Sequence, residues 1–483
     1  MLDVAIIGCG IVGAAAAYEL SKYELGLVVL EKENDVAASG ATKANSAIIH
    51  AGYDPEPGTL MAKLNVEGTK LAKELFKALD IHHRECGALV LAFSEQEMPV
   101  LEHLKQNGIT NGVPDLKIVT GAQALEIEPN LNPSVFAALL APSAMIVNPW
   151  EYTLALAETA VKNGAELRRN CEITGIDKID GVFVIHTSLG EIRARYIINA
   201  AGLYSDKIHN MVSSSKQEFT IMPDRGEYYL LDTNEGTRVS HVVFPCPDAH
   251  GKGVLVSPTV HGNLIVGPSN SPPSGPDDVA NTSEAMAYVM EVSRRSVPSI
   301  DFRANIRNFA GNRAKTDHSD FIIAPAQGAE GFINLAGIKS PGLSAAPAIA
   351  KMAADLLAES GLKLQPKQTF HNECKRIRFS ELSPDEKAAL VARDPAYGQI
   401  ICRCETVTAG EIRDVLSSPI PPVSLDGVKR RCRPGSGRCQ GGFCAPRVME
   451  ILAKHYDCPP SEIQQDIAET YILTVETKGG RVS

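Results

Sequence analysis

Residues 2–31 read LDVAIIGCGIVGAAAAYELSKYELGLVVLE, and this stretch is the strongest guide to the architecture of the chain. The apolar run 2–7 predicts a short strand, and the alanine-rich run 11–20 predicts a helix. A second apolar run, 25–30, predicts another strand. Together these elements form a compact βαβ unit, which is typical of an α/β domain with a parallel sheet.

The loop between the first strand and the helix is a Gly-x-Gly-x-x-Gly sequence. Gly8 permits a tight turn, Gly10 lets a pyrophosphate approach the backbone, and Gly13 lets the helix pack close to the strand. Glu31 ends the second strand, where a carboxylate can accept hydrogen bonds from ribose hydroxyls. A simple glycine-rich turn is the structural alternative, but the agreement of strand, helix and acid favours a nucleotide cofactor.

The composition is that of an ordinary globular protein. A chain of 483 residues suggests about three domains, and 44% hydrophobic with 22% charged residues is unremarkable. The net charge of −10 argues against a nucleic-acid binder. The longest apolar run, 6–17, contains three glycines and lacks a basic flank, so we expect neither membrane insertion nor a signal peptide. We therefore expect a cytoplasmic protein.

Four of the eleven cysteines form two close pairs near the C-terminus. Cys402 and Cys404 form a CxC pair, and Cys439 and Cys444 form a CxxxxC pair. In a reducing compartment, clustered thiolates indicate a metal centre rather than disulfides. Zinc and buried free cysteines are alternatives. A neighbouring redox cofactor would favour an iron–sulfur cluster, because it needs an outlet for electrons.

Basic residues surround Cys432, a fifth cysteine that lies outside the paired pattern. They either form a solvated face or offset the negative charge of a cluster and contact an acidic partner. They are Lys429, Arg430, Arg431, Arg433 and Arg438.

The rest of the chain suggests a second sheet and a separate C-terminal unit. Residues 219–268 are rich in short strands, as in an antiparallel substrate-binding sheet. Strand 332–336 leads through a glycine loop into an apolar helix, 344–357, whose N-terminus could face an anionic ligand. Residues 361–396 are polar enough to be a linker, with a capping box at Ser383.

Several motifs resemble a known family. The N-terminal loop, ARYIINAAGLYSD at 194–206 and GIKSPGLSAAPAI at 337–349 look like FAD-dependent oxidoreductases of the D-amino-acid oxidase superfamily. SGATKANSAIIHAG at 39–52 and RGEYY at 225–229 look like L-2-hydroxyglutarate oxidases. The C-terminal part resembles the bacterioferritin-associated-ferredoxin-like module, which binds a 2Fe–2S cluster. The same fusion occurs in anaerobic glycerol-3-phosphate dehydrogenases and opine oxidases.

The resemblance implies a fold class and a domain division. It implies an α/β protein with a Rossmann-like FAD-binding domain, an antiparallel-sheet substrate domain and a small helical 2Fe–2S domain. The FAD-binding parts would be about 1–80, 145–215 and 330–360, the substrate parts about 81–144 and 216–329, followed by a linker at 361–396, the cluster domain at 397–460 and a tail at 461–483.

The resemblance also implies contacts for FAD. Glu31 would bind the adenosine ribose, and the segment around Ser39 would follow the pyrophosphate toward the isoalloxazine ring. The loop 337–344 would lie at the pyrimidine end of the flavin, where a helix N-terminus stabilises negative charge. The expected contacts are Gly8, Gly10, Ile11, Val12, Gly13, Glu31, Lys32, Ser39, Thr42, Asn45, Ser46, Ile173, Ala201, Gly202, Gly337, Gly342, Leu343 and Ser344.

Four further residues are candidates for catalysis. His50 has a side chain suited to a general base, although a packed histidine is the competing interpretation. Arg313 and Arg225 could bind an anionic substrate, or each could form a surface ion pair, and Arg313 is preferred. Lys339 lies in the flavin loop. A similarly placed lysine occurs in glycerol-3-phosphate dehydrogenases but not in the hydroxyglutarate oxidases, which favours the former.

We therefore expect a flavoprotein dehydrogenase that oxidises a small anionic hydroxy substrate, with sn-glycerol 3-phosphate preferred. L-2-hydroxyglutarate and an opine-type amine are alternatives. Electrons would pass to the 2Fe–2S cluster and then to a partner, an electron-accepting flavoprotein subunit, within an oligomer or hetero-complex. A non-catalytic redox-sensing or scaffolding subunit is the alternative from a different class.

Overall fold

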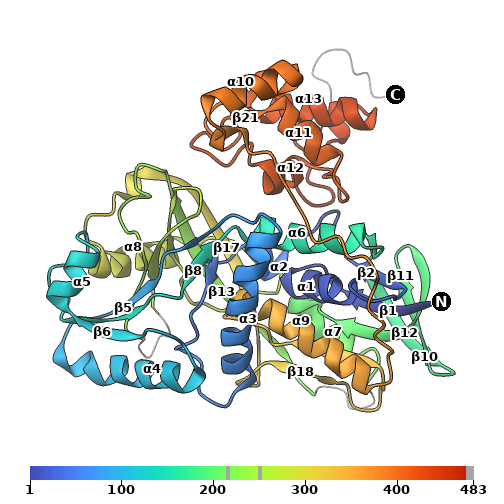
Figure 1. Cartoon of the computed structure of the whole chain (residues 1–483), viewed down its shortest axis with the longest axis horizontal. Helices are drawn as coiled ribbons and strands as arrows, with labels where there is room; N and C mark the ends of the chain where they lie inside the picture. Colours follow the sequence, from blue (N-terminus) through green and yellow to red (C-terminus); the bar gives the residue numbers. More distant parts are fainter. Residues whose placement is uncertain (214–217, 248–252, 475–483) are drawn as a thin grey trace.

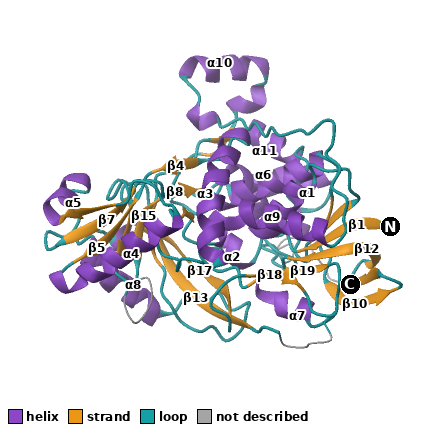
Figure 2. Ribbon diagram, turned by 60° about the horizontal axis from the view of Figure 1, so that its bottom comes forward, coloured by secondary structure: helices purple, strands orange, loops and turns teal. Residues whose placement is uncertain are grey.

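Two large sheets organise the chain (Figure 1). The structure is a computed structural model that describes residues 1–213, 218–247 and 253–474. Figures 1 and 2 show a group of long helices between the strands of the two sheets, and Figure 1 shows the C-terminal region as a separate cap above them. Among the described helices, none has the length and apolar character needed to cross a bilayer.

The first sheet has a parallel core in the order β9-β2-β1-β12-β19. The last four residues of β1, Val4 to Ile7, are buried because the sheet is covered on both faces, which is why this part of the sequence is an apolar run. Helices cover one face, and the hairpin of β10 and β11 packs against the other. The elements are β1 (Leu2–Ile7), β2 (Leu27–Leu30), β9 (Glu166–Arg168), β10 (Ile173–Ile179), β11 (Val182–Thr187), β12 (Gly190–Asn199), β18 (Ile322–Pro325), β19 (Phe332–Ala336), α1 (Ile11–Leu20), α3 (Leu60–Ala78), α6 (Pro149–Lys162), α7 (Ser205–His209) and α9 (Gly342–Glu359).

The second sheet has eight strands in the order β17-β13-β16-β15-β14-β5-β7-β6. Its two longest strands, β13 (Ile221–Leu231) and β17 (Asn305–Thr316), pair antiparallel along their length. Gly311 lets β17 approach α2 (Gly40–Lys43), since a Cβ there would lie 2.2 Å from the carbonyl oxygen of Ala44. The other elements are β5 (Ala88–Ala92), β6 (Lys117–Thr120), β7 (Ala137–Ala141), β14 (Val242–Pro245), β15 (Leu255–Pro258), β16 (Leu264–Gly267), α4 (Met98–Asn111), α5 (Gly121–Ile127) and α8 (Ser283–Ser296).

The C-terminal region is mainly helical and has its own core, which includes Ile412, Val428 and Leu452. Together with the two sheets, this region confirms the predicted fold class. Its elements are α10 (Pro384–Arg393), β20 (Ile400–Cys402), β21 (Val407–Thr408), α11 (Ala409–Leu416), α12 (Leu425–Cys432) and α13 (Ala445–Tyr456). A smaller sheet in the body joins β3 (Ile48–Ile49), β8 (Met145–Val147) and β4 (His83–Glu85).

The polar segment before the C-terminal region is fixed to the body. The Arg376 guanidinium lies 3.0 Å from Glu158, and the Arg378 guanidinium contacts Glu151 and lies 2.8 Å from Asp80. The predicted capping box at Ser383 starts α10. The polar composition of residues 361–396 predicts a linker. In the structure, arginines of this segment pair with carboxylates of the body, largely on α6.

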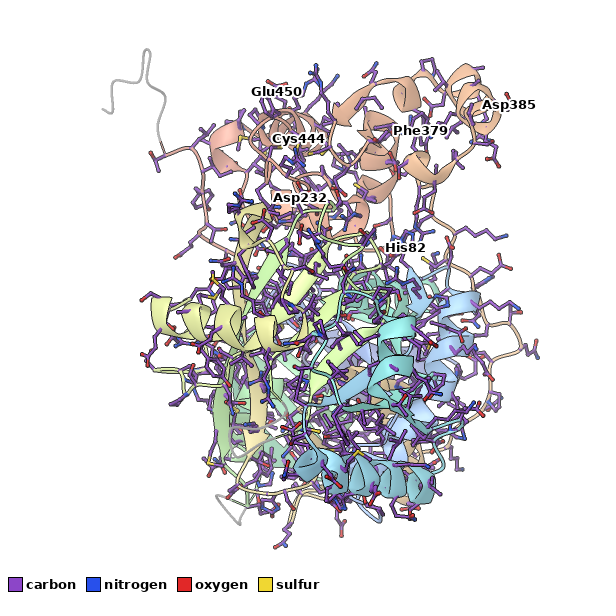
Figure 3. All side chains as sticks on the ribbon, turned by 90° about the vertical axis from the view of Figure 1, so that its left-hand side faces the viewer. His82, Asp232, Phe379, Asp385, Cys444 and Glu450 are labelled. Carbon is purple, nitrogen blue, oxygen red and sulfur yellow. The ribbon has the colours of Figure 1, made fainter. Side chains whose placement is uncertain are left out.

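A buried ion pair fixes α12 to the N-terminal part of the chain. The Asp35 carboxylate is fully buried and accepts hydrogen bonds from Arg430 at 2.9 Å and from Arg431 at 2.7 and 2.8 Å. Burial alone would raise the pKa of Asp35, but the two guanidinium groups hold it well below its usual range. Arg430 also donates to Asp466, at 2.6 Å, which in turn binds Lys43. Figure 3 shows the C-terminal region, with Cys444 and Glu450, above Asp232 and His82 of the body.

We predict that Asp35→Asn loosens this contact. Removing one partner of a buried ion pair leaves the other charge uncompensated, so we expect the free energy of unfolding to fall by about 3–5 kcal/mol. Denaturant unfolding would measure the loss, and limited proteolysis would report release of the C-terminal region.

Asp301→Asn is the matched control, because Asp301 pairs with an Arg303 side chain that is 91% exposed. We expect no measurable change there. Equal behaviour of the two variants would contradict a role for Asp35 in holding the domains together.

Candidate active site

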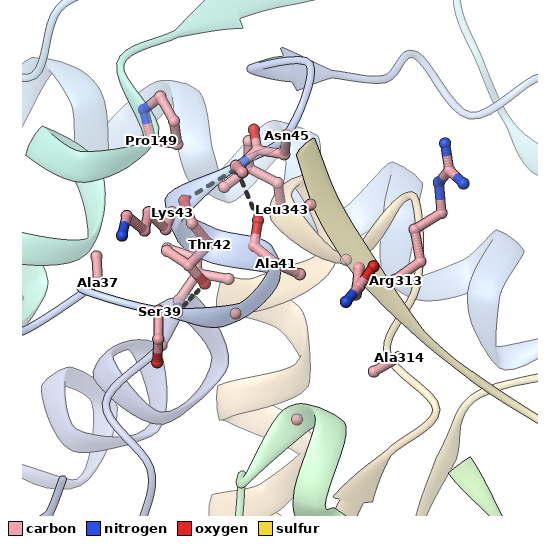
Figure 4. A pocket seen from close by; sticks show the side chains of 18 of the residues that line it. Ala37, Ser39, Ala41, Thr42, Lys43, Asn45, Pro149, Arg313, Ala314 and Leu343 are labelled. Atoms are coloured by element: carbon pink, nitrogen blue, oxygen red, sulfur yellow. Dashed lines mark hydrogen bonds between the residues drawn. The ribbon is translucent and has the colours of Figure 1, made fainter. Parts of the chain in front are cut away.

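One continuous cavity of about 1700 Å³ runs between the two sheets and reaches the C-terminal region. It begins at the Gly8 loop, follows the loop at residues 37–48, passes Arg313 and ends against α12. Figure 4 shows two of its walls, with Ser39 to Asn45 on one side and Arg313 and Ala314 on another.

The glycine loop is shaped to receive a pyrophosphate. Gly8 has φ +96°, and a Cβ there would lie 2.6 Å from the carbonyl oxygen of Ala200. A Cβ at Gly13 would lie 1.9 Å from the carbonyl oxygen of Gly8, so only glycine lets α1 start this close to β1. A helix N-terminus that opens into a cavity binds anionic groups well. These residues therefore fit the predicted nucleotide cofactor.

Glu31 is buried and lines the same cavity. Its carboxylate accepts hydrogen bonds from the backbone N–H of Cys9 at 2.7 Å and of Glu33 at 3.0 Å. Burial raises the pKa of Glu31, while these two N–H groups oppose the shift. The backbone thus holds the carboxylate in place at the end of β2. Lys32 also lines the cavity, with its Nζ 4.2 Å from the centroid of the Tyr204 ring.

The loop after Ser39 is held by its own side chains. Thr42 Oγ1 accepts a hydrogen bond from the Ile11 N–H at 3.0 Å. Asn45 donates to the carbonyl oxygens of Ala41 and Thr42, both at 3.0 Å, so its amide shapes the loop. The Ser46 hydroxyl lies 3.2 Å from the hydroxyl of Tyr228, which connects the loop to β13.

The loop before α9 and the first turn of α9 hold His50. Ser344 Oγ accepts a hydrogen bond from the His50 backbone N–H at 2.8 Å, and Ser340 Oγ lies 3.2 Å from His50 Nε2. The imidazole therefore lines the cavity in a fixed position. Most predicted FAD contacts also line the cavity, and the exceptions are Gly13, Gly337 and Ser344.

The substrate-domain wall of the cavity carries a cluster of charged residues. The Asp224 carboxylate lies 2.6 Å from both Arg313 Nη1 and Lys315 Nζ. A Cβ at Gly226 would lie 2.5 Å from Arg313 Nη2, so this glycine makes room for the guanidinium. Lys339 lines the cavity as well, and its Nζ lies 3.1 Å from the carbonyl oxygen of Ser319.

The sequence analysis did not single out Lys315, and the structure puts Arg225 in an ion pair away from the cavity lining. Lys315 lies two residues after Arg313 on β17, and that spacing puts both on one face of the strand. Arg225 is buried and absent from the described cavity lining. Its guanidinium lies 3.0 Å from Asp278 and 3.4 Å from Glu227. Neighbouring residues on a strand face opposite sides of the sheet. Asp224 faces the cavity, so Arg225 next to it faces away from the cavity and forms a structural ion pair.

The four paired cysteines meet in the C-terminal region. Cys404 Sγ lies 3.8 Å from Cys402 Sγ and 3.8 Å from Cys439 Sγ, and the thiols of Cys402 and Cys444 also interact. Burial and the neighbouring thiols raise the pKa of Cys404 to about 11. In the described chain, no group of three or more His, Cys, Asp and Glu side chains gathers around a single ion position. The four thiols form one connected group, because Cys404 lies beside both Cys402 and Cys439 and Cys402 lies beside Cys444. They therefore supply the four thiolate ligands that the predicted 2Fe–2S cluster needs.

Comparison with known families agrees with both halves of this arrangement. Residues 3–356 match the family described as FAD dependent oxidoreductase, DAO, and residues 400–454 match the BFD-like [2Fe-2S] binding domain. The chain belongs to the DAO family of FAD-dependent oxidoreductases. The predicted cofactors, FAD and a 2Fe–2S cluster, are thereby confirmed, and the zinc alternative is not supported.

Individual relatives differ in how much of this DAO-family chain they match. This chain is 48% identical over 479 residues to the glycerol 3-phosphate dehydrogenase of Caloramator mitchellensis, and the match covers 99% of each chain. The dithionite-reduced L-alpha-glycerophosphate oxidase of Mycoplasma pneumoniae, solved with FAD bound, is 34% identical with a TM-score of 0.73 and covers 78% of this chain and 99% of its own. Human mitochondrial L-2-hydroxyglutarate dehydrogenase is 34% identical over 55% of this chain and 60% of its own.

We predict that Gly13→Ala prevents FAD retention. The added Cβ would press on the Gly8 carbonyl, which should lower the free energy of unfolding by about 1–3 kcal/mol and distort the loop. Gel filtration followed by absorbance would show how much flavin remains bound. Gly275→Ala is the control, because a Cβ there meets nothing within 4 Å. Full flavin content in Gly13→Ala would contradict the fit described above.

Proposed function

We propose that this oxidoreductase is a dehydrogenase of sn-glycerol 3-phosphate. The observation that carries the proposal is the cationic wall formed by Arg313, Lys315 and Lys339 in the cavity of the flavin site. A phosphate monoester carries between one and two negative charges at neutral pH and is well matched to a guanidinium fork and ammonium groups. A relative matched over 99% of each chain is a glycerol 3-phosphate dehydrogenase, which supports this substrate.

The roles of the residues follow from their positions. Arg313 would bind the phosphate, with Asp224 fixing the guanidinium. His50, held by Ser340 and Ser344, would take the proton of the substrate hydroxyl. Lys339 would stabilise negative charge near the start of α9. FAD, when bound, accepts the hydride, and the 2Fe–2S cluster carries the electrons onward.

The C-terminal domain supports a dehydrogenase rather than an oxidase. The Mycoplasma oxidase is matched over 99% of its own length but covers only 78% of this chain. The additional part of this chain includes a cluster domain at 400–454. We propose that it passes electrons to a partner flavoprotein subunit in a hetero-complex. We also propose the division into an oxidoreductase at 1–360, a connecting segment at 361–396, a cluster domain at 397–460 and a tail at 461–483.

An anaerobic substrate screen tests the proposal. The holoenzyme is mixed with sn-glycerol 3-phosphate, L-2-hydroxyglutarate or an opine-type secondary amine, and flavin absorbance is followed. We expect rapid bleaching by glycerol 3-phosphate alone. Bleaching by hydroxyglutarate would favour the function of the human relative, and no bleaching by any of them would favour a redox sensor.

We predict that Arg313→Ala raises KM for the substrate. Losing one charge-assisted contact costs about 1.5–3 kcal/mol, which corresponds to roughly ten- to more than a hundredfold in KM. Steady-state kinetics would measure the change, and flavin content should stay constant. Arg303→Ala is the control, since that side chain is 91% exposed and pairs with Asp301. An unchanged KM in Arg313→Ala would remove this residue from the substrate site.

We predict that Cys439→Ser separates the two half-reactions. Substrate should still bleach the flavin, while turnover with an acceptor that depends on the cluster is lost. The wild type should contain iron and acid-labile sulfide in equal amounts, about two of each per chain. Cys458→Ser is a control, because that cysteine lies outside the two pairs. Full turnover in Cys439→Ser would mean that the cluster is structural.

A further inference from the structure

The cavity has a second cationic end, far from Arg313. Arg307 and Arg313 both line it from β17 and lie six residues apart, which corresponds to about 20 Å along a strand. Arg307 donates to Gln440 at 3.3 Å, so this end lies where the cluster domain meets the substrate domain. It is therefore separate from the proposed substrate position.

Lys429 on α12 is the central residue of this second end. It is only 8% exposed and lines the cavity. Its one ion-pair contact among the described residues is Asp426, at 4.0 Å, which is beyond hydrogen-bond range. Burial lowers the pKa of Lys429 to about 8; Arg307 and Arg430 add to this shift, while the carboxylates of Asp426 and Asp466 oppose it. A buried ammonium group without a close partner is unfavourable unless an anion accompanies it.

Two further polar atoms at this end also lack partners. Arg430 uses its terminal nitrogens on Asp35 and Asp466, and its Nε has no hydrogen-bond partner within the described chain. The Ser436 hydroxyl is likewise buried without a described partner. Both residues line the cavity. Because these two residues line the cavity, a ligand there that supplies acceptor oxygens would satisfy their donors.

The local charges match a dianion. Six basic side chains face four carboxylates here, so two positive charges are unmatched among the described residues of this end. An oxidised 2Fe–2S cluster held by four thiolates carries two negative charges and could offset this excess, but it would not satisfy the Arg430 and Ser436 donors, which need direct contact. The basic residues are Lys43, Arg307, Lys429, Arg430, Arg431 and Arg433, and the carboxylates are Asp35, Glu405, Asp426 and Asp466.

We propose that a phosphate monoester binds at this second end, between α12 and the start of β17, with Lys429, Arg430 Nε and Ser436 as its ligands. The ligand is either free inorganic phosphate or the phosphate group of a larger bound molecule. Either one would complete the contact between the cluster domain and the rest of the chain.

Thermal unfolding of the holoenzyme with inorganic phosphate tests the site, with sodium chloride at equal ionic strength as the control. We expect phosphate to raise Tm by about 2 °C or more in the wild type and in Arg313→Ala, which lacks the substrate-end arginine. Lys429→Met should lose this response. Without phosphate it should be at least as stable as the wild type, because it removes an uncompensated buried charge.

Three outcomes would overturn the proposal. They are a phosphate response that persists in Lys429→Met, a response that is lost in Arg313→Ala, and loss of FAD from Lys429→Met. The second would place phosphate at the substrate end, and the third would assign Lys429 to the FAD site. If Lys429→Met does not fold, Ser436→Ala provides the same comparison with a smaller change.

Analysis of the small molecules that remain bound to the purified protein identifies the source of the phosphate group. Acid extracts of the wild type and of Lys429→Met are separated by chromatography, and phosphate esters other than FAD are quantified. A second ester in the wild type that is missing from the variant would support a larger bound molecule. FAD alone in both extracts, together with the thermal response, would support free phosphate. FAD alone with no thermal response overturns the site.

Discussion

The pairing of Asp35 with Arg430 and Arg431 is the constraint on which the arrangement of domains depends. All three side chains are almost completely removed from solvent, so the charges are acceptable only while they remain in contact. Asp35 precedes the loop that leads to Ser39, and Arg431 precedes the cysteine-rich loop of the cluster domain. One contact therefore fixes the position of the redox domain relative to the flavin loop.

The local features of this architecture could be predicted from the sequence. The βαβ unit, the glycine loop and the cysteine pairs depend on short spacings that are visible in the chain, and β1 and α1 have the predicted bounds. The strand predicted at 25–30 begins two residues later, at Leu27. The carbonyl oxygen of Gly26 accepts hydrogen bonds from the chain at Asp3 and Val4 just before this strand.

Contacts between distant segments could not be predicted in the same way. Whether Arg225 or Arg313 faces the cavity depends on the register of β13 against β17, in which Asp224 lies opposite Arg313. Shifting that register by one residue would exchange the two faces of the strand. Similarly, a polar composition cannot reveal that Arg376 and Arg378 pair with the body, because their partners lie more than two hundred residues earlier.

The distribution of charge explains how an acidic chain has two cationic regions in one cavity. The net charge of −10 describes the whole molecule, whereas the cavity collects basic side chains from β17, α12 and the loop before α9. Where a carboxylate such as Asp224 is present, it orients the cations and leaves part of their hydrogen-bonding capacity for a ligand. Low-dielectric walls strengthen such local fields. The charge that matters for binding is therefore set by the register of two strands and the position of one docked helix.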